Sequence, residues 1–183
     1  VDEETGMLGA AALDASVLMG RTMLNLDSED EGILTVGCAG GNVSVCTLPV
    51  ARAPFSGALL AVTVGGLHGG HSGAEIDKGR GNANLLMGRV LYAVSERTPL
   101  RLVSVAGGLK DNAIPRESRA VIAVADAAAA QAAIADIDAA LRHEYAAADP
   151  DVFVRAETTQ AQQPPMDAVS TQRAVCMLSL IHI

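Results

Sequence analysis

The sequence predicts an α/β segment followed by an α+β domain, and the order of its apolar runs carries most of that prediction. Over residues 1–42, short apolar runs alternate with Gly-containing turns and one Ala-rich stretch, which is typical of strand, loop, helix, strand order. Over residues 43–163 the order becomes β-α-β-β-α-β, the arrangement of a ferredoxin-like domain. Residues 164–175 begin a further helix, and residues 176–183 form an apolar tail that we expect to be non-native.

The first segment is expected to contain short strands and one short helix. Residues 1–10 resemble a strand end that runs into a Gly-containing loop, and the helix follows at about residues 9–13. The apolar runs 23–26 and 33–37 have the length of buried strands. A turn with two glycines at residues 38–41 ends the segment, so we place the domain boundary at about residue 42.

The second segment is expected to form a sheet covered by helices. Its first strand is apolar and contains β-branched Val, which favours a pleated, buried surface. Leu86 and Val90 share one face of the first helix, and Ile134 and Ile137 recur at helical spacing in the second. Strands are expected at residues 58–65, 102–106, 120–125 and 152–156, and helices at residues 82–95 and 127–147.

Charge and composition exclude several classes of partner. The 183 residues include 13 Lys and Arg against 21 Asp and Glu, a net charge of −8. Because an acidic surface repels phosphate backbones, we expect no nucleic-acid partner. No run of 18 apolar residues and no signal-peptide pattern is present, so we expect no membrane span. The three cysteines form neither a paired framework nor a C-x-x-C motif, which favours the reducing cytoplasm.

Acidic residues follow two of the predicted strands in the first segment. Glu3 and Glu4 come at the end of the first strand, and Asp27 follows the next. Because open α/β sheets assemble their sites at the carboxyl ends of strands, these acids predict a divalent-cation site. One acid left unligated beside the ion would act as general base on bound water. The alternative is a solvated acidic turn, which is the more frequent case for such residues.

Two Gly-rich loops in the second segment carry further candidates. His71 lies in the Gly-Gly-His-Ser-Gly motif at residues 69–73, where the backbone can approach a ligand closely, although the same glycines suit a plain surface turn. His68 suggests a His-x-x-His zinc motif, but no third ligand accompanies it at suitable spacing. Asn112 lies in a loop longer than a hairpin needs and offers a donor and an acceptor to a peptide, while turn formation alone is the alternative.

Four separated stretches of the chain carry recognisable motifs. They are Asp-Glu-Glu-Thr-Gly-Met at 2–7, Asn-Leu-Asp-Ser-Glu-Asp-Glu-Gly at 25–32 with Val-Gly-Cys-Ala-Gly-Gly at 36–41, Gly-Leu-His-Gly-Gly-His-Ser-Gly at 66–73 with Gly-Arg-Gly-Asn-Ala-Asn at 79–84, and Gly-Leu-Lys-Asp-Asn-Ala-Ile-Pro-Arg at 108–116. In order and composition they resemble the aminoacyl-histidine dipeptidases, also called cytosolic non-specific dipeptidases or bacterial carnosinases. The resemblance runs from residue 1 to about residue 173.

The resemblance implies a role for each candidate residue. Glu3 matches the family's catalytic base, while Glu4 and Asp27 match ligands of its two zinc ions. His71 matches a lid-domain histidine that holds the substrate and polarises the scissile carbonyl, and Asn112 matches a lid residue at the substrate's C-terminal end. Mn or Co would accept the same ligand types as zinc.

The resemblance also implies the architecture and its gaps. Residues 1–42 match the end of a dizinc catalytic-domain segment, residues 43–163 the first half of a ferredoxin-like lid, and residues 164–175 the start of the second half. The family's upstream His-x-Asp, its bridging Asp and its downstream His are not found in this sequence, so we expect a fragment that is inactive alone. The alternatives are a lid-type module that forms a homodimer without catalysis, and a related deacylase of N-acyl amino acids.

Overall fold

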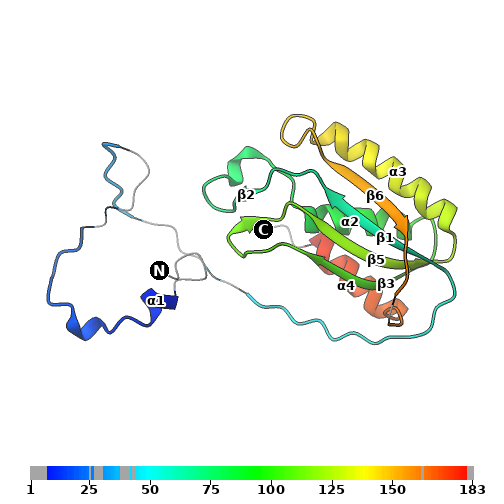
Figure 1. Cartoon of the computed structure of the whole chain (residues 1–183), viewed down its shortest axis with the longest axis horizontal. Helices are drawn as coiled ribbons and strands as arrows, with labels where there is room; N and C mark the ends of the chain where they lie inside the picture. Colours follow the sequence, from blue (N-terminus) through cyan, green and yellow to red (C-terminus); the bar gives the residue numbers. More distant parts are fainter. Residues whose placement is uncertain are drawn as a thin grey trace. The chain divides into compact units, whose positions relative to one another are not determined.

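The computed structural model describes residues 8–24, 26, 31–37, 42, 44–161 and 163–180. The chain divides into two compact units, Val1–Asn42 and Val43–Ile183 (Figure 1). Within the described ranges, every strand lies in the second unit. None of the helices in these ranges combines the length and apolarity of a membrane span.

The first unit contains two short helical segments among its described residues. α1 spans Leu8–Ala11, which confirms the helix predicted near residues 9–13, and the 3-10 helix η2 spans Ala15–Val17. The Asp14 carboxylate caps η2 by accepting a hydrogen bond of 2.9 Å from the Ser16 amide. Hydrogen bonds local to the sequence therefore account for the helical structure seen here.

The strands predicted at residues 23–26 and 33–37 are wrong for the residues described there, none of which is in a strand. Their apolar side chains are exposed, with Met23 at 87% and Leu34 at 93%. A strand is stabilised by hydrogen bonds to its neighbours, and the described residues of the first unit supply no partner strand. An apolar run predicts a buried strand only where such partners exist.

The second unit is built on an antiparallel sheet in the order β3-β5-β1-β6 (Figure 1). At its centre, Val62 of β1 pairs with Ala120 of β5 on one side and Ala156 of β6 on the other. The predicted β-α-β-β-α-β order and the mixed α/β class are confirmed. The strands are β1 (Ala58–Gly65), β3 (Leu100–Gly107), β5 (Ser118–Val124) and β6 (Phe153–Thr158).

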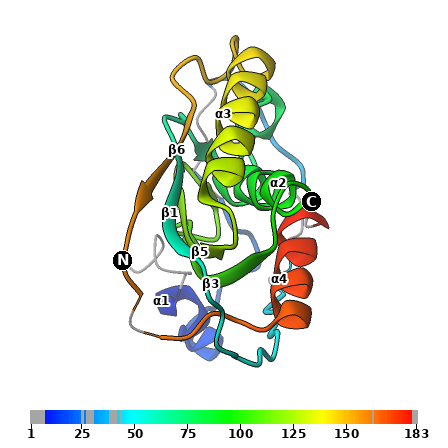
Figure 2. The ribbon, with the colours of Figure 1, turned by 90° about the vertical axis from the view of Figure 1, so that its right-hand side faces the viewer.

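Three helices cover one face of this sheet. α2 spans Ala83–Ser95, α3 spans Ala127–Glu144 and α4 spans Ala168–Leu180, and Figure 2 shows all three on the same side of the sheet. Asn82 and Asp126 cap α2 and α3, since each side chain accepts hydrogen bonds from two amides of the first turn. Each cap stabilises its helix by about 1 kcal/mol and fixes the residue at which the helix begins. Both helices begin within one residue of the predicted start.

The core lies between β1, its neighbouring strands and the helices. Leu60, Val62 and Val64 alternate along β1 and belong to one buried cluster with Leu86 and Val90 of α2. Full burial of each such side chain contributes about 1.5–3 kcal/mol relative to exposure. With only 2% aromatic residues in the sequence, this core is aliphatic. It supports the loops at the end of the sheet where β1 finishes.

α4 packs against α2 at a glycine. A Cβ atom at Gly88 would lie 2.9 Å from backbone atoms of Leu178 and Ser179, so the missing side chain permits close approach of the two helices. The Leu178 side chain packs against the core. Residues 176–180 therefore continue α4, while the expectation that the tail 176–183 is non-native stays a prediction.

A small second sheet joins two segments that the sequence predicts as loops. β2 (Gly70–His71) pairs antiparallel with β4 (Ala113–Ile114), and the 3-10 helix η3 (Ile76–Lys78) follows β2. Strands of two residues are too short to show an alternating pattern, so no periodicity in the sequence could indicate them. We call the β2–β4 pair the site ribbon.

Candidate functional site

The site ribbon brings His71 and Asn112 close together from different loops. His71 pairs with Ala113, the residue after Asn112. The Ser72 amide donates a hydrogen bond of 2.9 Å to the Asn112 carbonyl oxygen. Both residues are exposed, so their side chains are accessible to a ligand.

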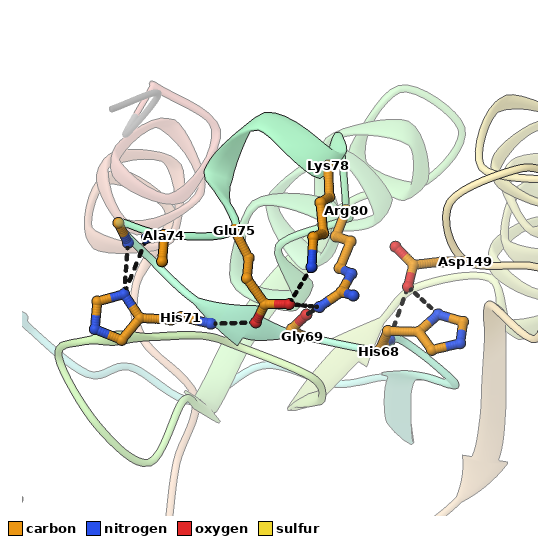
Figure 3. Close-up of polar contacts among 9 residues, drawn as sticks. His68, Gly69, His71, Ala74, Glu75, Lys78, Arg80 and Asp149 are labelled. Atoms are coloured by element: carbon orange, nitrogen blue, oxygen red, sulfur yellow. Dashed lines mark hydrogen bonds and ion pairs between the residues drawn. The ribbon is translucent and has the colours of Figure 1, made fainter. Parts of the chain in front are cut away.

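The His71 ring is oriented by the backbone that follows it (Figure 3). Its Nδ1 atom accepts hydrogen bonds from the amides of Gly73 and Ala74, both at 3.1 Å. A ring nitrogen that accepts carries no proton, so the neutral imidazole has its proton on Nε2. The exposed edge of His71 is therefore a hydrogen-bond donor, suited to an acceptor such as a carbonyl oxygen.

Glu75 ties the segment around His71 together. Its Oε2 atom accepts a hydrogen bond of 2.9 Å from the His71 amide, and its Oε1 atom lies 2.6 Å from Lys78 Nζ and 3.2 Å from Arg80 NH1. Arg80 also donates to the Gly69 carbonyl oxygen (Figure 3). The hydrogen bond from Lys78, followed by that from the His71 amide, lowers the pKa of Glu75 to about 2. The carboxylate is thus charged at any physiological pH.

The backbone angle of Gly70 and its closeness to Arg80 and Glu75 both favour a glycine at this position. Its φ is +140°, a conformation that L side chains rarely adopt. A Cβ atom there would lie 2.5 Å from both Arg80 NH1 and Glu75 Oε2. The glycine therefore permits close approach, as the sequence predicts, but the approaching groups are the protein's own charged side chains.

Asp149 binds two further segments next to the ribbon. It is fully buried and accepts hydrogen bonds from the His68 amide at 2.7 Å and His68 Nδ1 at 3.0 Å (Figure 3). It also accepts one from the Gly81 amide at 2.6 Å. Burial raises the pKa of Asp149, but the His68 and Gly81 amides and the His68 ring together outweigh it and hold the pKa below its usual range. The carboxylate connects the segment before β2 with the segment before α2.

An open groove of about 710 Å³ lies beside the site ribbon. Its rim includes Arg116, whose Nε donates a hydrogen bond of 3.3 Å to the Leu67 carbonyl oxygen. A groove of this volume with mixed lining is of the size that small organic ligands occupy. Its apolar side chains include Leu67, Leu109, Ile114 and Phe153, and its charged or titratable ones are His68, Arg116, Glu117 and Asp151.

The predicted metal centre lies outside the described residues, because Glu3, Glu4 and Asp27 all fall there. In the part of the chain that the structure describes, no three His, Cys, Asp or Glu side chains gather as a metal site requires. His68 binds Asp149 through Nδ1 instead of forming a ligand pair with His71. The described residues thus do not fit a zinc ion by themselves, and the His-x-x-His motif is not a metal site here.

Glu75 and Asp149 are the residues of this region that sequence reasoning missed. Glu75 follows His71 by four residues, a spacing that can return a side chain to an amide, and Asp149 lies in an Asp-Pro-Asp sequence after a helix. Acids in loops are usually solvated, so neither signal distinguishes them from ordinary surface carboxylates.

Comparison with known proteins gives three consistent similarities. Residues 62–149 match the family model described as the peptidase dimerisation domain. The chain is 46% identical over 125 residues to the cytosol non-specific dipeptidase of Escherichia coli (strain K12), covering 67% of this chain and 26% of that protein. The crystal structure of aminoacylhistidine dipeptidase from Vibrio alginolyticus matches with a TM-score of 0.65 and 31% identity, over 72% of this chain and 28% of that one.

These similarities agree with the fold. The family match begins within β1 and ends at Asp149, so it includes the site ribbon and the residues that support it. The chain corresponds to about a quarter of the length of each relative. Over residues 62–149, just under half of its length, the chain therefore matches the peptidase dimerisation domain family, and it is similar to the aminoacyl-histidine and cytosol non-specific dipeptidases.

Proposed function

We propose that a full-length protein containing this chain hydrolyses dipeptides, including Xaa-His dipeptides, and that the second unit binds the substrate through its site ribbon. The observation that carries the proposal is the His71 ring, which two backbone amides hold with Nε2 as its exposed donor. The similarity to two dipeptidases supports the same reaction class.

His71 would donate a hydrogen bond from Nε2 to the carbonyl oxygen of the scissile peptide bond. That oxygen gains negative charge as water attacks, and a donor oriented in advance stabilises it. Asn112 would donate from its side-chain amide to the C-terminal carboxylate of the substrate. Adjacent strands lie about 5 Å apart, so His71 in β2 and Asn112, which directly precedes β4, can contact one dipeptide.

The metal chemistry of the reaction is assigned to the first unit. Glu4 and Asp27 would each hold one of two zinc ions, with Mn or Co acceptable to the same ligands, and Glu3 would be the catalytic base. When bound, the metal would supply Lewis-acid activation of water. All three residues lie outside the described ranges, and the roles of His71 and Asn112 do not depend on which metal is used.

The dimerisation-domain match supports a homodimer formed through the second unit. The relative named a cytosol dipeptidase supports a cytoplasmic location. We expect the 183-residue chain alone to be inactive, because Glu4 and Asp27 do not complete two metal sites. The same match supports a second candidate function, a dimerisation module without catalysis.

The test is hydrolysis by the full-length protein with added Zn or Mn, beside the same protein carrying Glu3→Gln. Cleavage of an Xaa-His dipeptide and of a dipeptide without His is expected, with a loss of about 10²–10⁴-fold in the variant while the bound metal stays constant. Cleavage of N-acyl amino acids alone would assign a deacylase instead. A metal-loaded dimer that cleaves neither substrate would leave the dimerisation module as the function.

A further inference from the structure

We infer that Glu75 is a positioning residue, which sets the direction of the His71 ring through the turn that both residues close. This inference rests on the proposed role of His71 only for its effect on catalysis. Its structural part concerns the described residues alone, and it is testable without any enzymatic activity.

Two reciprocal hydrogen bonds join residues 71 and 75. The Glu75 amide donates to the His71 carbonyl oxygen at 3.1 Å, and the His71 amide donates to Glu75 Oε2 at 2.9 Å. Inside the turn, the His71 ring accepts from the amides of Gly73 and Ala74. The arrangement resembles a capping box, in which one side chain accepts from the turn and a second returns to the first residue's amide.

The opposite side of Glu75 is held by two cations. Lys78 and Arg80 both bind Oε1, and Arg80 also donates to the carbonyl oxygen of Gly69, two residues before His71 (Figure 3). Glu75 therefore fixes the backbone on both sides of the ring. β2 has only two residues, so its ladder to β4 gives the ring little other support.

Removing the carboxylate should release the ring. Without the bond to Oε2 the His71 amide is free, the turn opens, and the Gly73 and Ala74 amides no longer select Nδ1 as acceptor. In water the two neutral tautomers of imidazole then exchange, and the donor toward the substrate is present for only part of the time. Glu75→Gln keeps an oxygen acceptor for the His71 amide, although its NH₂ group then faces Lys78 and Arg80 in place of Oε1. Glu75→Ala removes the acceptor, and Glu75→Asp is one methylene too short.

The first measurement is ¹⁵N NMR of the histidine rings in the 183-residue chain at a pH where His71 is neutral. The unmodified chain and Glu75→Gln should show one His71 tautomer, protonated on Nε2, while Glu75→Ala and Glu75→Asp should show an averaged pair. The matched control is Asp77→Ala, an exposed acid of the same loop for which no hydrogen bond or ion pair is found among the described residues. If Glu75→Ala fails to fold by far-UV circular dichroism, Glu75→Asp carries the same expectation. An unchanged His71 tautomer in the folded variants would overturn the inference.

The second measurement is dipeptide hydrolysis by the full-length protein. Glu75→Ala should lower kcat about tenfold with KM within about twofold, because the loss concerns a donor that acts in the transition state. Glu75→Gln should restore most of the rate, and Asp77→Ala should match the parent. Equal losses in Glu75→Gln and Glu75→Ala would refute the positioning role. If the parent protein hydrolyses no dipeptide, the proposed function fails and the NMR result alone decides the inference.

Discussion

Asp149→Ala is expected to destabilise the second unit by about 3 kcal/mol. The substitution leaves the buried Gly81 amide without its acceptor at 2.6 Å, and the partly buried His68 amide without its acceptor at 2.7 Å. Each unpaired buried donor costs about 1–3 kcal/mol. The His68 side chain is 50% exposed and can turn its Nδ1 toward water, so it adds little. Asp149→Asn keeps one carbonyl oxygen but places an NH₂ group against a donor. We expect it to lower the free energy of unfolding by about 2 kcal/mol.

The assay is urea unfolding of the 183-residue chain, followed by far-UV circular dichroism. With a slope of about 2 kcal/mol per molar urea, a loss of 3 kcal/mol lowers the unfolding midpoint by about 1.5 M. The matched control is Asp151→Ala, two residues along the chain, where the side chain is exposed. Its free energy of unfolding should stay within about 0.5 kcal/mol of the parent, which at the same slope is about 0.25 M in midpoint. Equal midpoints for Asp149→Ala and Asp151→Ala would refute the reasoning.

Three further predictions follow from the same structure. The pKa of Asp149 lies below its ordinary value of 3.8, and the pKa of Glu75 is lowered from 4.5 to about 2. Each carboxylate therefore contributes its full stability at pH values above its ordinary pKa. That stability is lost as the pH falls through the lowered pKa of the folded state. Below about pH 4, the urea midpoint of the parent should thus decrease more steeply with falling pH than the midpoint of Asp149→Ala. Parallel curves of midpoint against pH would contradict this. Gly88→Ala should destabilise the chain, because the added Cβ would lie 2.9 Å from the α4 backbone. This is expected although alanine is more favourable than glycine in a helix by about 1 kcal/mol. A raised urea midpoint would show that α4 does not pack there. His143→Ala, an exposed histidine in the last turn of α3, should leave dipeptide hydrolysis by the full-length protein unchanged, and a loss of rate would show that the assay responds to any histidine.

The α+β domain could be predicted from the sequence because its signals are local and repeated. β1 falls on the predicted residues 58–65, and Asn82 marks the start of α2 as an N-cap does. The strands predicted at residues 23–26 and 33–37 failed where they are described, since apolarity reports a tendency to be buried and not the presence of a partner. β2 and β4 were not predicted, because a strand of two residues is too short to show an alternating pattern of apolar and polar residues.

The candidate site was predictable as a set of residues but not as a geometry. The motifs single out His71 and Asn112, and nothing in their spacing shows that His71 pairs with Ala113, the residue directly after Asn112. The direction of the His71 ring depends on the Gly73 and Ala74 amides, which no side-chain pattern reveals. Asp149 is distinguished from other acids only by its burial, a property of the folded chain.

The central claim, that His71 supplies a donor to the reacting carbonyl oxygen, is tested most directly by steady-state hydrolysis of an Xaa-His dipeptide by the full-length protein carrying His71→Ala. Loss of one such donor lowers kcat by about 10²–10³-fold in comparable sites, and that loss is expected here with KM little changed. A kcat within about threefold of the parent, in a variant that still folds and binds metal, would contradict the account.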